Sequence, residues 1–495
     1  MERFARDQLF IGGQWMKPSK DERISIVSPV TEEAIGSAAA AGLADVEIAV
    51  GAARQALKGE WVDLDLAARA ALIRRAADYL DERGREITEL LAWEMGSPVG
   101  TGGYLRSPLT RMRESFPAAA ARVQLREVRR NEEGAALLQQ IPIGVVAAIT
   151  PWNTAFGGVI LKTIPALLAG CPVLLKPSPQ TALDPYYLAE ALEWAGLPGG
   201  MFNILPGGSD VGEAMVQHPG VDMVTFTGSS AVGRAIAAMA SGSMKRVVLE
   251  CGGKSAAIVL EDANLEECIR VIAGANFSLS GQYCRALSRV LAPRSRHQEV
   301  VDAIVEAARS IRIGDPFDEA SKMGPLVSAA QRDRTERYVA VGREEGAVVV
   351  LGGQRPEGLP VGYYFEPTVF VGVENSMRIA QEEIFGPVVS VIAYDDVDEA
   401  IAIANDSSYG LSGAVFTEDF DEGLRVASAI ESGLVGINAQ GARESVPCGG
   451  VKLSGMGDEH GPEGFQEFLQ PKAVIIPELL AARLEAAGTP SVRLS

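Results

Sequence analysis

At residues 223–233 the chain reads Met-Val-Thr-Phe-Thr-Gly-Ser-Ser-Ala-Val-Gly. The first four residues are apolar or β-branched and predict a buried strand, and a helix is predicted over residues 231–239. A strand that ends in a glycine turn before a helix presents free backbone N–H groups and the positive end of the helix dipole, which suit a phosphate. A plain glycine turn with a serine helix cap is the alternative.

The same alternation surrounds this segment from about residue 142 onward. Strands are predicted at 145–150, 172–176, 202–205, 223–226 and 246–249, and helices at 156–169, 183–195, 210–218 and 231–239. A spacing of roughly 20 to 30 residues is typical of βαβ units. The sequence therefore predicts an α/β fold with a Rossmann-like, doubly wound parallel sheet covered by helices on both faces.

A second series of strands and helices follows the first. Its predicted strands are 256–260, 289–291, 347–351, 388–394, 412–416 and 434–437, and its predicted helices are 265–279, 299–312 and 421–430. This series indicates a second α/β domain.

Residues 122–141 differ from both series, because polar and apolar residues alternate loosely around Asn131-Glu132-Glu133-Gly134. We interpret them as a protruding hairpin. Such an arm cannot bury its own apolar face, so it should pack against another segment or subunit. Residues 472–476 could add a strand to it, and residues 479–495 are expected to form a short helix and tail.

Composition excludes several classes of function. The 495 residues carry a net charge of −19 that is spread along the chain, which disfavours nucleic acid and anionic membranes as partners. Apolar runs stay below the ~18 residues of a membrane span, and residues 1–13 contain no apolar signal core, so we expect a cytoplasmic protein. The five cysteines and three histidines show no metal-ligand spacing, so no metal site is predicted.

Three polar residues stand out in this background. Cys284 lies in a glycine-containing loop, Glu250 ends the predicted strand 246–249, and Asn153 follows the strand 145–150. A loop thiol can be a nucleophile, a strand-end acid can project into a ligand crevice, and an amide can donate to an oxyanion. Each also has a structural alternative, namely a core cysteine, a solvated turn and a helix cap.

Taken together, the motifs resemble those of the aldehyde dehydrogenase superfamily, in order and spacing, from near Phe10 to near Val474. The matching segments are Pro151-Trp152-Asn153, Lys176-Pro177-Ser178, Phe226-Thr227-Gly228-Ser229 with Gly233, Leu249-Glu250-Cys251-Gly252-Gly253-Lys254, Gly281-Gln282-Tyr283-Cys284, Glu382-Glu383-Ile384-Phe385-Gly386-Pro387, Asn405 with Tyr409-Gly410-Leu411, and Pro447-Cys448-Gly449-Gly450-Val451-Lys452.

The resemblance implies a cofactor-binding domain (residues 1–121 and 142–250), a catalytic domain (251–452), and an oligomerisation arm with the C-terminal segment (122–141 and 453–495). It implies that Cys284 is the nucleophile, Glu250 the general base and Asn153 part of the oxyanion hole. The implied cofactor-binding residues are Thr150, Trp152, Lys176, Ser178, Gly208, Phe226, Gly228, Ser229, Glu383 and Phe385.

The resemblance further implies an enzyme that oxidises an aldehyde to a carboxylic acid through a cysteine thioester, with NAD as cofactor and NADP possible, in a homodimer or homotetramer. A coenzyme-A-acylating dehydrogenase and a catalytically silent protein of the same fold are the alternatives. Pro179 stands where many NAD-preferring relatives have Glu, and Cys448 where Phe is usual. We expect the substrate to be a bulky, uncharged aldehyde, terpenoid or aromatic, because Thr154, Gly157, Gly158 and Leu161 should line the tunnel.

Overall fold

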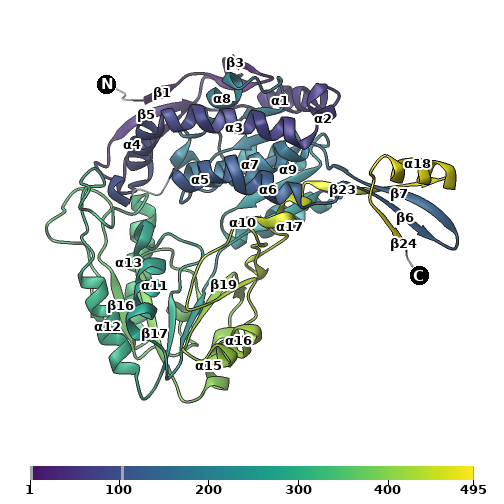
Figure 1. Ribbon diagram of the computed structural model, residues 1–495. Helices are drawn as coiled ribbons and strands as arrows, with labels where there is room; N and C mark the ends of the chain where they lie inside the picture. Colours follow the sequence, from purple (N-terminus) through teal and green to yellow (C-terminus); the bar gives the residue numbers. More distant parts are fainter. Residues whose placement is uncertain (1–3, 102–104, 494–495) are drawn as a thin grey trace.

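The computed structural model describes residues 4–101 and 105–493, which form two large sheets and a projecting arm (Figure 1). The first sheet has the strand order β10-β9-β8-β11-β12-β22. Its strands are β8 (Val146–Ile149), β9 (Val173–Lys176), β10 (Phe202–Ile204), β11 (Met223–Thr227), β12 (Arg246–Glu250) and β22 (Gly455–Met456). The five long strands are parallel, and β22 is antiparallel to β12.

The chain enters this sheet at β8, moves outward through β9 and β10, and then returns to β11 on the other side of β8. The strand order therefore reverses between β8 and β11. Ligands of open α/β sheets bind in the crevice at the carboxyl ends of the strands at such a reversal. The predicted doubly wound topology is confirmed.

Helices cover both faces of the first sheet, as its apolar strands require. Val146 and Ala148 of β8 pack in one core, and Val145 and Ala147 pack in the other. The first core is covered by α3 (Leu66–Glu82), α7 (Ala155–Ala169) and α8 (Pro185–Trp194), and the second by α1 (Leu43–Ala56), α9 (Ser209–Gln217) and α10 (Ser230–Ser241). The period of two along β8 thus divides its side chains between two separate cores.

The second sheet has the order β15-β16-β17-β14-β13-β19-β20 and is parallel except between β15 and β16. Its strands are β13 (Ala256–Val259), β14 (Arg289–Pro293), β15 (Val348–Leu351), β16 (Thr368–Val371), β17 (Val388–Tyr394), β19 (Ser412–Phe416) and β20 (Leu434–Ile437). The predicted helices are observed as α11 (Leu265–Phe277), α12 (His297–Arg309) and α16 (Phe420–Ala429). Sequence analysis missed β16, α13 (Ala329–Glu344) and α15 (Val397–Asn405).

The arm extends away from the two sheets (Figure 1). Its hairpin consists of β6 (Arg126–Asn131) and β7 (Gly134–Pro142), and β23 (Leu469–Ile476) pairs antiparallel with β7 along its whole length. The predicted hairpin and its added strand are therefore both present. In the expected tail, α18 (Glu478–Ala486) packs on the arm and β24 (Ser491–Arg493) pairs with β6, whereas residues 494 and 495 lie outside the described part of the chain.

Residues 453–468 differ from the expectation that placed them with the arm. Strand β22 extends the edge of the first sheet, and α17 (Gly461–Gln466) packs against α6 (Phe116–Ala121) and α7. Phe465 and Phe468 are buried in the core of that sheet. These apolar side chains draw the segment into the sheet, so the arm strand begins only at Leu469.

Trp61 provides a test of the helical layer that supports α7. It lies in α2 (Glu60–Asp63), is fully buried, and donates from Nε1 to the Leu167 carbonyl of α7 at 3.0 Å. We expect Trp61→Ala to lower the melting temperature strongly, since removing a buried aromatic side chain costs about 3–5 kcal/mol. Trp194→Ala is the control, because Trp194 is 61% exposed and should change the melting temperature little. Equal shifts in thermal unfolding would contradict this packing.

Candidate active site

A cavity of about 400 Å³ is lined by residues of both α/β bodies, that is, the part of the chain built on the first sheet and the part built on the second. Helix α7 and the end of β12 form one side, and the loop after α11 forms another. The lining residues are Ser97, Pro98, Ser107, Pro108, Arg111, Thr154, Gly157, Gly158, Leu161, Lys162, Thr227, Glu250, Ser278, Leu279, Tyr283, Cys284, Arg285, Lys322, Glu459 and His460. The predicted tunnel residues of α7 are all among them.

A strained turn brings Cys284 to this cavity. After α11, Leu279, Ser280 and Gly281 have φ values of 50°, 57° and 71°, in the left-handed region. At Gly281 a Cβ atom would lie 2.3 Å from the backbone of Gly386, so only glycine fits. Cys284 is half-buried, whereas the other four cysteines are buried. Because its thiol is partly accessible from the cavity, Cys284 is a better candidate for a nucleophile than the four buried cysteines.

Asn153 is tied directly to the cysteine loop. Its Nδ2 donates to the backbone carbonyl of Gln282 at 2.9 Å, and the residue is 5% exposed. Gln282 is held in turn, because its Oε1 accepts from the Val327 amide at 2.9 Å. The sequence left open whether Asn153 is only a helix cap. The helix cap position of α7 is Thr154, and the Asn153 amide faces the second body instead.

Glu250 ends β12 and is 4% exposed. Within the described residues its Oε1 has no hydrogen-bond partner. Burial and the neighbouring Glu459 carboxylate raise the pKa of Glu250 to about 8. Glu250 therefore exchanges a proton near neutral pH, as a general base requires.

Sequence analysis missed a buried ion pair in the same cavity. Lys162 is 1% exposed, and its Nζ lies 2.7 Å from Glu459 and donates to Thr225 Oγ1 at 3.1 Å. The available signal was one lysine within the apolar stretch of α7. A charge there is costly unless it is paired, so its partner had to be a carboxylate from elsewhere in the chain.

The predicted cofactor residues lie along one edge of the first sheet. Because parallel strands end at the same edge, residues that follow β8, β9, β10 and β11 meet there. Thr150 and Trp152 follow β8, Lys176 and Ser178 lie at and beyond the end of β9, Gly208 precedes α9, and Phe226, Gly228 and Ser229 lie at the end of β11. From the second body, Phe385 packs edge-on against Trp152 with ring centroids 5.3 Å apart.

Details of this edge fit a dinucleotide. Gly228 approaches the Phe226 ring so closely that a Cβ would lie 2.4 Å from it, and Ser229 caps α10. Burial lowers the pKa of Lys176 to about 8, and its Nζ donates to the Pro177 carbonyl at 3.3 Å. Glu383 accepts from the Gly253 amide at 3.1 Å, and burial raises its pKa to about 7. A helix N-terminus, an ammonium and a carboxylate are groups that can bind phosphate and ribose.

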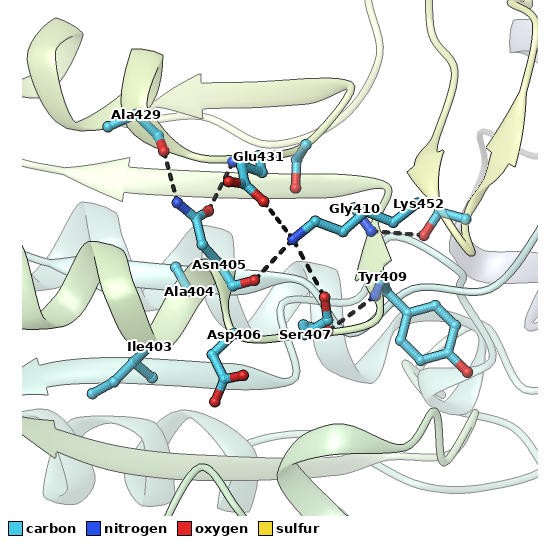
Figure 2. A network of polar contacts seen from close by, with 12 residues as sticks. Ile403, Ala404, Asn405, Asp406, Ser407, Tyr409, Gly410, Ala429, Glu431 and Lys452 are labelled. Carbon is cyan, nitrogen blue, oxygen red and sulfur yellow. Dashed lines mark hydrogen bonds and ion pairs between the residues drawn. The ribbon is translucent and has the colours of Figure 1, made fainter.

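Other motif residues stabilise the loops around the site rather than entering it. Lys452 binds the carbonyls of Asn405 and Ser407 and pairs with Glu431 at 2.7 Å, as Figure 2 shows. Asn405 accepts from the Glu431 amide and donates to Ala429. Ser454, two residues beyond Lys452, donates to the Gly252 carbonyl at 2.7 Å. This network anchors the segment next to Glu250.

Among the described residues, no group of three or more His, Cys, Asp or Glu side chains is placed to hold a metal ion. In the same part of the chain, none of the helices combines the length and the apolar character needed to cross a membrane.

Replacing Glu250 with Gln tests how the buried carboxyl group changes the free energy of unfolding. An exposed glutamate has a pKa of about 4.3, so between that pH and about 8 the unfolded chain has lost a proton that the folded protein retains. The free energy of unfolding contributed by Glu250 therefore falls as pH rises through this window. We expect Glu250→Gln to raise the melting temperature at about pH 8 and to change it little at about pH 4.5. A rise in melting temperature that does not depend on pH would contradict the raised pKa of Glu250. Glu213→Gln, at an exposed position, is the control.

Comparisons with known proteins agree with this geometry. The aldehyde dehydrogenase family model matches residues 15–474. A geranial dehydrogenase of Castellaniella defragrans is 43% identical over 471 residues, which are 94% of this chain and 98% of the relative. The crystal structure of a Mycobacterium tuberculosis aldehyde dehydrogenase complexed with NAD+ has 44% identity and a TM-score of 0.93, covering 96% of this chain and 98% of that one.

A mutant of a Pseudomonas syringae aldehyde dehydrogenase, solved with NAD+ and octanal, has 39% identity and a TM-score of 0.91 and covers 95% of this chain and 96% of that one. The family resemblance of the motifs and the predicted α/β fold class are confirmed by these matches. The chain belongs to the aldehyde dehydrogenase family, whose members are oxidoreductases acting on aldehydes.

Proposed function

We propose that the protein oxidises an aldehyde to its carboxylic acid with Cys284 as nucleophile, Asn153 as oxyanion donor and Glu250 as general base. One observation carries the proposal. The half-buried Cys284 and the buried carboxyl group of Glu250 line the same cavity, and Asn153 is hydrogen-bonded to the loop of Cys284. A nucleophile, a base and an oxyanion donor at one site are what acyl chemistry requires.

In the first step the Cys284 thiolate bonds to the aldehyde carbon. The carbonyl oxygen then becomes an alkoxide, which the Asn153 amide and the Cys284 backbone N–H stabilise as hydrogen-bond donors. Burial raises the pKa of Cys284 to about 11, so the thiol needs a nearby base to lose its proton. Glu250, with a pKa of about 8, is that base.

Glu250 first releases to solvent the proton that it took from Cys284. In the last step it removes a proton from the water that hydrolyses the thioester, and the Cys284 thiolate leaves. The buried ion pair of Lys162 and Glu459 lines the same cavity as Glu250. A coenzyme-A-acylating enzyme would not need this base, so the buried Glu250 favours hydrolysis. A silent protein would not need to retain Cys284, Asn153 and Glu250 around one cavity.

We propose NAD as the cofactor, as in the family members solved with it. Bound NAD would supply the ring that accepts the hydride from the substrate carbon. Lys176 would bind a ribose hydroxyl, the end of α10 at Ser229 the pyrophosphate, and Glu383 and Phe385 the nicotinamide side. Trp152, Thr150, Ser178, Gly208, Phe226 and Gly228 complete the proposed binding set. Pro179 is uncharged and neither repels nor attracts the 2′-phosphate of NADP, so NADP remains a weaker alternative.

We also propose that the substrate is a bulky, uncharged aldehyde. Gly157 and Gly158 leave room along the cavity wall, and the Arg111 guanidinium there is paired with Glu444 at 2.8 Å. The geranial dehydrogenase relative acts on a terpenoid aldehyde by its name, which supports this class.

Assembly into a homodimer or homotetramer through the arm, in the cytoplasm, completes the proposal. The arm strand β23 lies at the edge of its sheet, and Ile475 on it is 83% exposed. An exposed apolar edge strand is a surface for pairing with another chain.

Replacing the proposed nucleophile tests the reaction directly. We expect Cys284→Ala to lower kcat for aldehyde-dependent NADH formation by at least about 10³-fold, because no other group can form the thioester. Binding of NAD, measured by calorimetry, should be retained. Cys251→Ala is the matched control and should stay active, since Cys251 is packed in the core beside Gly233. Loss of activity in the Cys251 variant alone would overturn the assignment.

Substrate preference is tested with acetaldehyde, succinic semialdehyde, benzaldehyde and a ten-carbon terpenoid aldehyde. We expect kcat/KM to be about tenfold higher for the last two, because the cavity wall accommodates apolar bulk. At Gly157 an added Cβ would come no closer than 3.7 Å to Pro108, so Gly157→Leu can fold and fill the cavity. This variant should lose activity on the terpenoid aldehyde more than on acetaldehyde. Preference of the parent for either of the first two aldehydes would contradict the proposal.

A further inference from the structure

Arg285 is a cation in the active-site cavity that the proposed reaction does not yet use. It follows Cys284 in the chain and lines the same cavity as Cys284 and Glu250. Its Nε is buried and has no hydrogen-bond partner among the described residues. A buried guanidinium N–H group that has no hydrogen-bond partner normally binds an anion.

The other basic residues of the cavity are differently placed. Lys162 is paired with Glu459, Arg111 is paired with Glu444, and Lys322 is exposed to solvent. Within the described chain, the basic residues of the cavity that pair with a carboxylate are Lys162, Arg111 and His460. Arg285 is not among them, and its side chain hydrogen-bonds that of Tyr283. Its positive charge is therefore available to a group that becomes negative during the reaction.

Two such groups lie nearby, and burial disfavours the charged form of both. Ionisation of Glu250 raises the pKa of Cys284, whereas the Arg285 charge lowers the pKa of each. The remaining titratable or charged groups around them are Glu459, Asp458, Lys162, Tyr283, Cys448, Glu383 and His460. Of these, Lys162 is already committed to Glu459. One counter-ion thus faces two buried acids, and it can balance one negative charge at a time.

We propose that Arg285 is a positioning residue, the shared counter-ion of Cys284 and Glu250, and that it holds one negative charge in the cavity whichever group bears it. The inference rests on the proposed function. When the Cys284 thiol ionises, its proton leaves Sγ and adds to the Glu250 carboxylate, and the negative charge passes from oxygen to sulfur. Arg285 stays protonated throughout. The transfer therefore creates no additional buried charge.

The test is the pH dependence of Cys284 alkylation by iodoacetamide in the protein without cofactor, followed by peptide mass spectrometry over about pH 7–12, a range that includes the raised pKa of Cys284 at about 11. Only the thiolate reacts, and Cys284 is the half-exposed cysteine of the five. We expect Arg285→Met to slow alkylation at about pH 7.5 roughly tenfold and to raise the midpoint by about one unit. Arg285→Lys keeps the charge and should react within about threefold of the parent.

Two further variants control the measurement. Lys322→Met removes a positive charge from the exposed rim of the same cavity, where solvent screens it, and should leave the midpoint unchanged. Cys284→Ala gives the background from the four buried cysteines. If Arg285→Met does not fold, as judged by its melting temperature, Arg285→Gln replaces it as the neutral variant.

The proposal would be overturned if Arg285→Met left the midpoint of Cys284 alkylation unchanged, or if Arg285→Lys were alkylated as slowly as Arg285→Met. A change limited to a higher KM for carboxylate-bearing aldehydes would also overturn it, because Arg285 would then bind substrate. The alkylation needs no aldehyde oxidation, so its outcome stands apart from the proposed function. That function fails instead if Cys284→Ala still forms NADH.

Discussion

The hydrogen bond from Asn153 Nδ2 to the Gln282 carbonyl joins the two α/β bodies at the point where their chemistry meets. Asn153 follows β8, the strand where the first sheet reverses its order, and Gln282 lies two residues before Cys284. The left-handed turn at residues 279–281 presents the thiol, and the bond aligns it with the amide. A displacement of either body would separate Cys284, the proposed nucleophile, from Asn153, its proposed oxyanion donor, so the remaining packing keeps the two residues in place.

Charge is the second constraint on the site. Glu250, Cys284 and Glu459 line one cavity. A charge on Glu459 raises the pKa of Glu250, and charges on Glu250 and Glu459 raise the pKa of Cys284. The Lys162 and Glu459 pair is internally balanced, which leaves Glu250 and Cys284 to share the charge of Arg285. Burial and the Glu459 carboxylate raise the pKa of Glu250 toward neutral pH, where proton exchange is most effective, and the Arg285 charge opposes this rise.

Local pattern was sufficient for most of the fold. Most strands of the two sheets are continuous apolar runs and were predicted within one or two residues, as with Val388–Tyr394 and Ser412–Phe416, whereas β16 and β22 were missed. Helix α13 was missed because it buries only three residues, among them Thr335 and Gly342, and so lacks an apolar stripe. The segment 453–468 was misplaced because its pairing partners are more than 200 residues away along the chain.

The candidate site depended on more than local pattern. Cys284 and Asn153 lie on loops and Glu250 lies at the end of β12, far apart in sequence, and only the family motifs indicated that they converge. The partner of Lys162 could not be predicted, since it depends on a tertiary contact that no single segment encodes. Residues such as Lys452 carry a family motif and yet stabilise a loop (Figure 2).

The central claim is that a thioester forms on Cys284 and that Glu250 is needed to hydrolyse it. Intact-protein and peptide mass spectrometry of Glu250→Gln, mixed with NAD and a terpenoid aldehyde, tests it most directly. The account predicts an adduct on Cys284 with the mass of the aldehyde less two hydrogens, formed more slowly than in the parent because Glu250 also deprotonates the thiol, together with one NADH per site and no further turnover. Absence of the adduct, its presence on another cysteine, or steady turnover at the parent rate would contradict it.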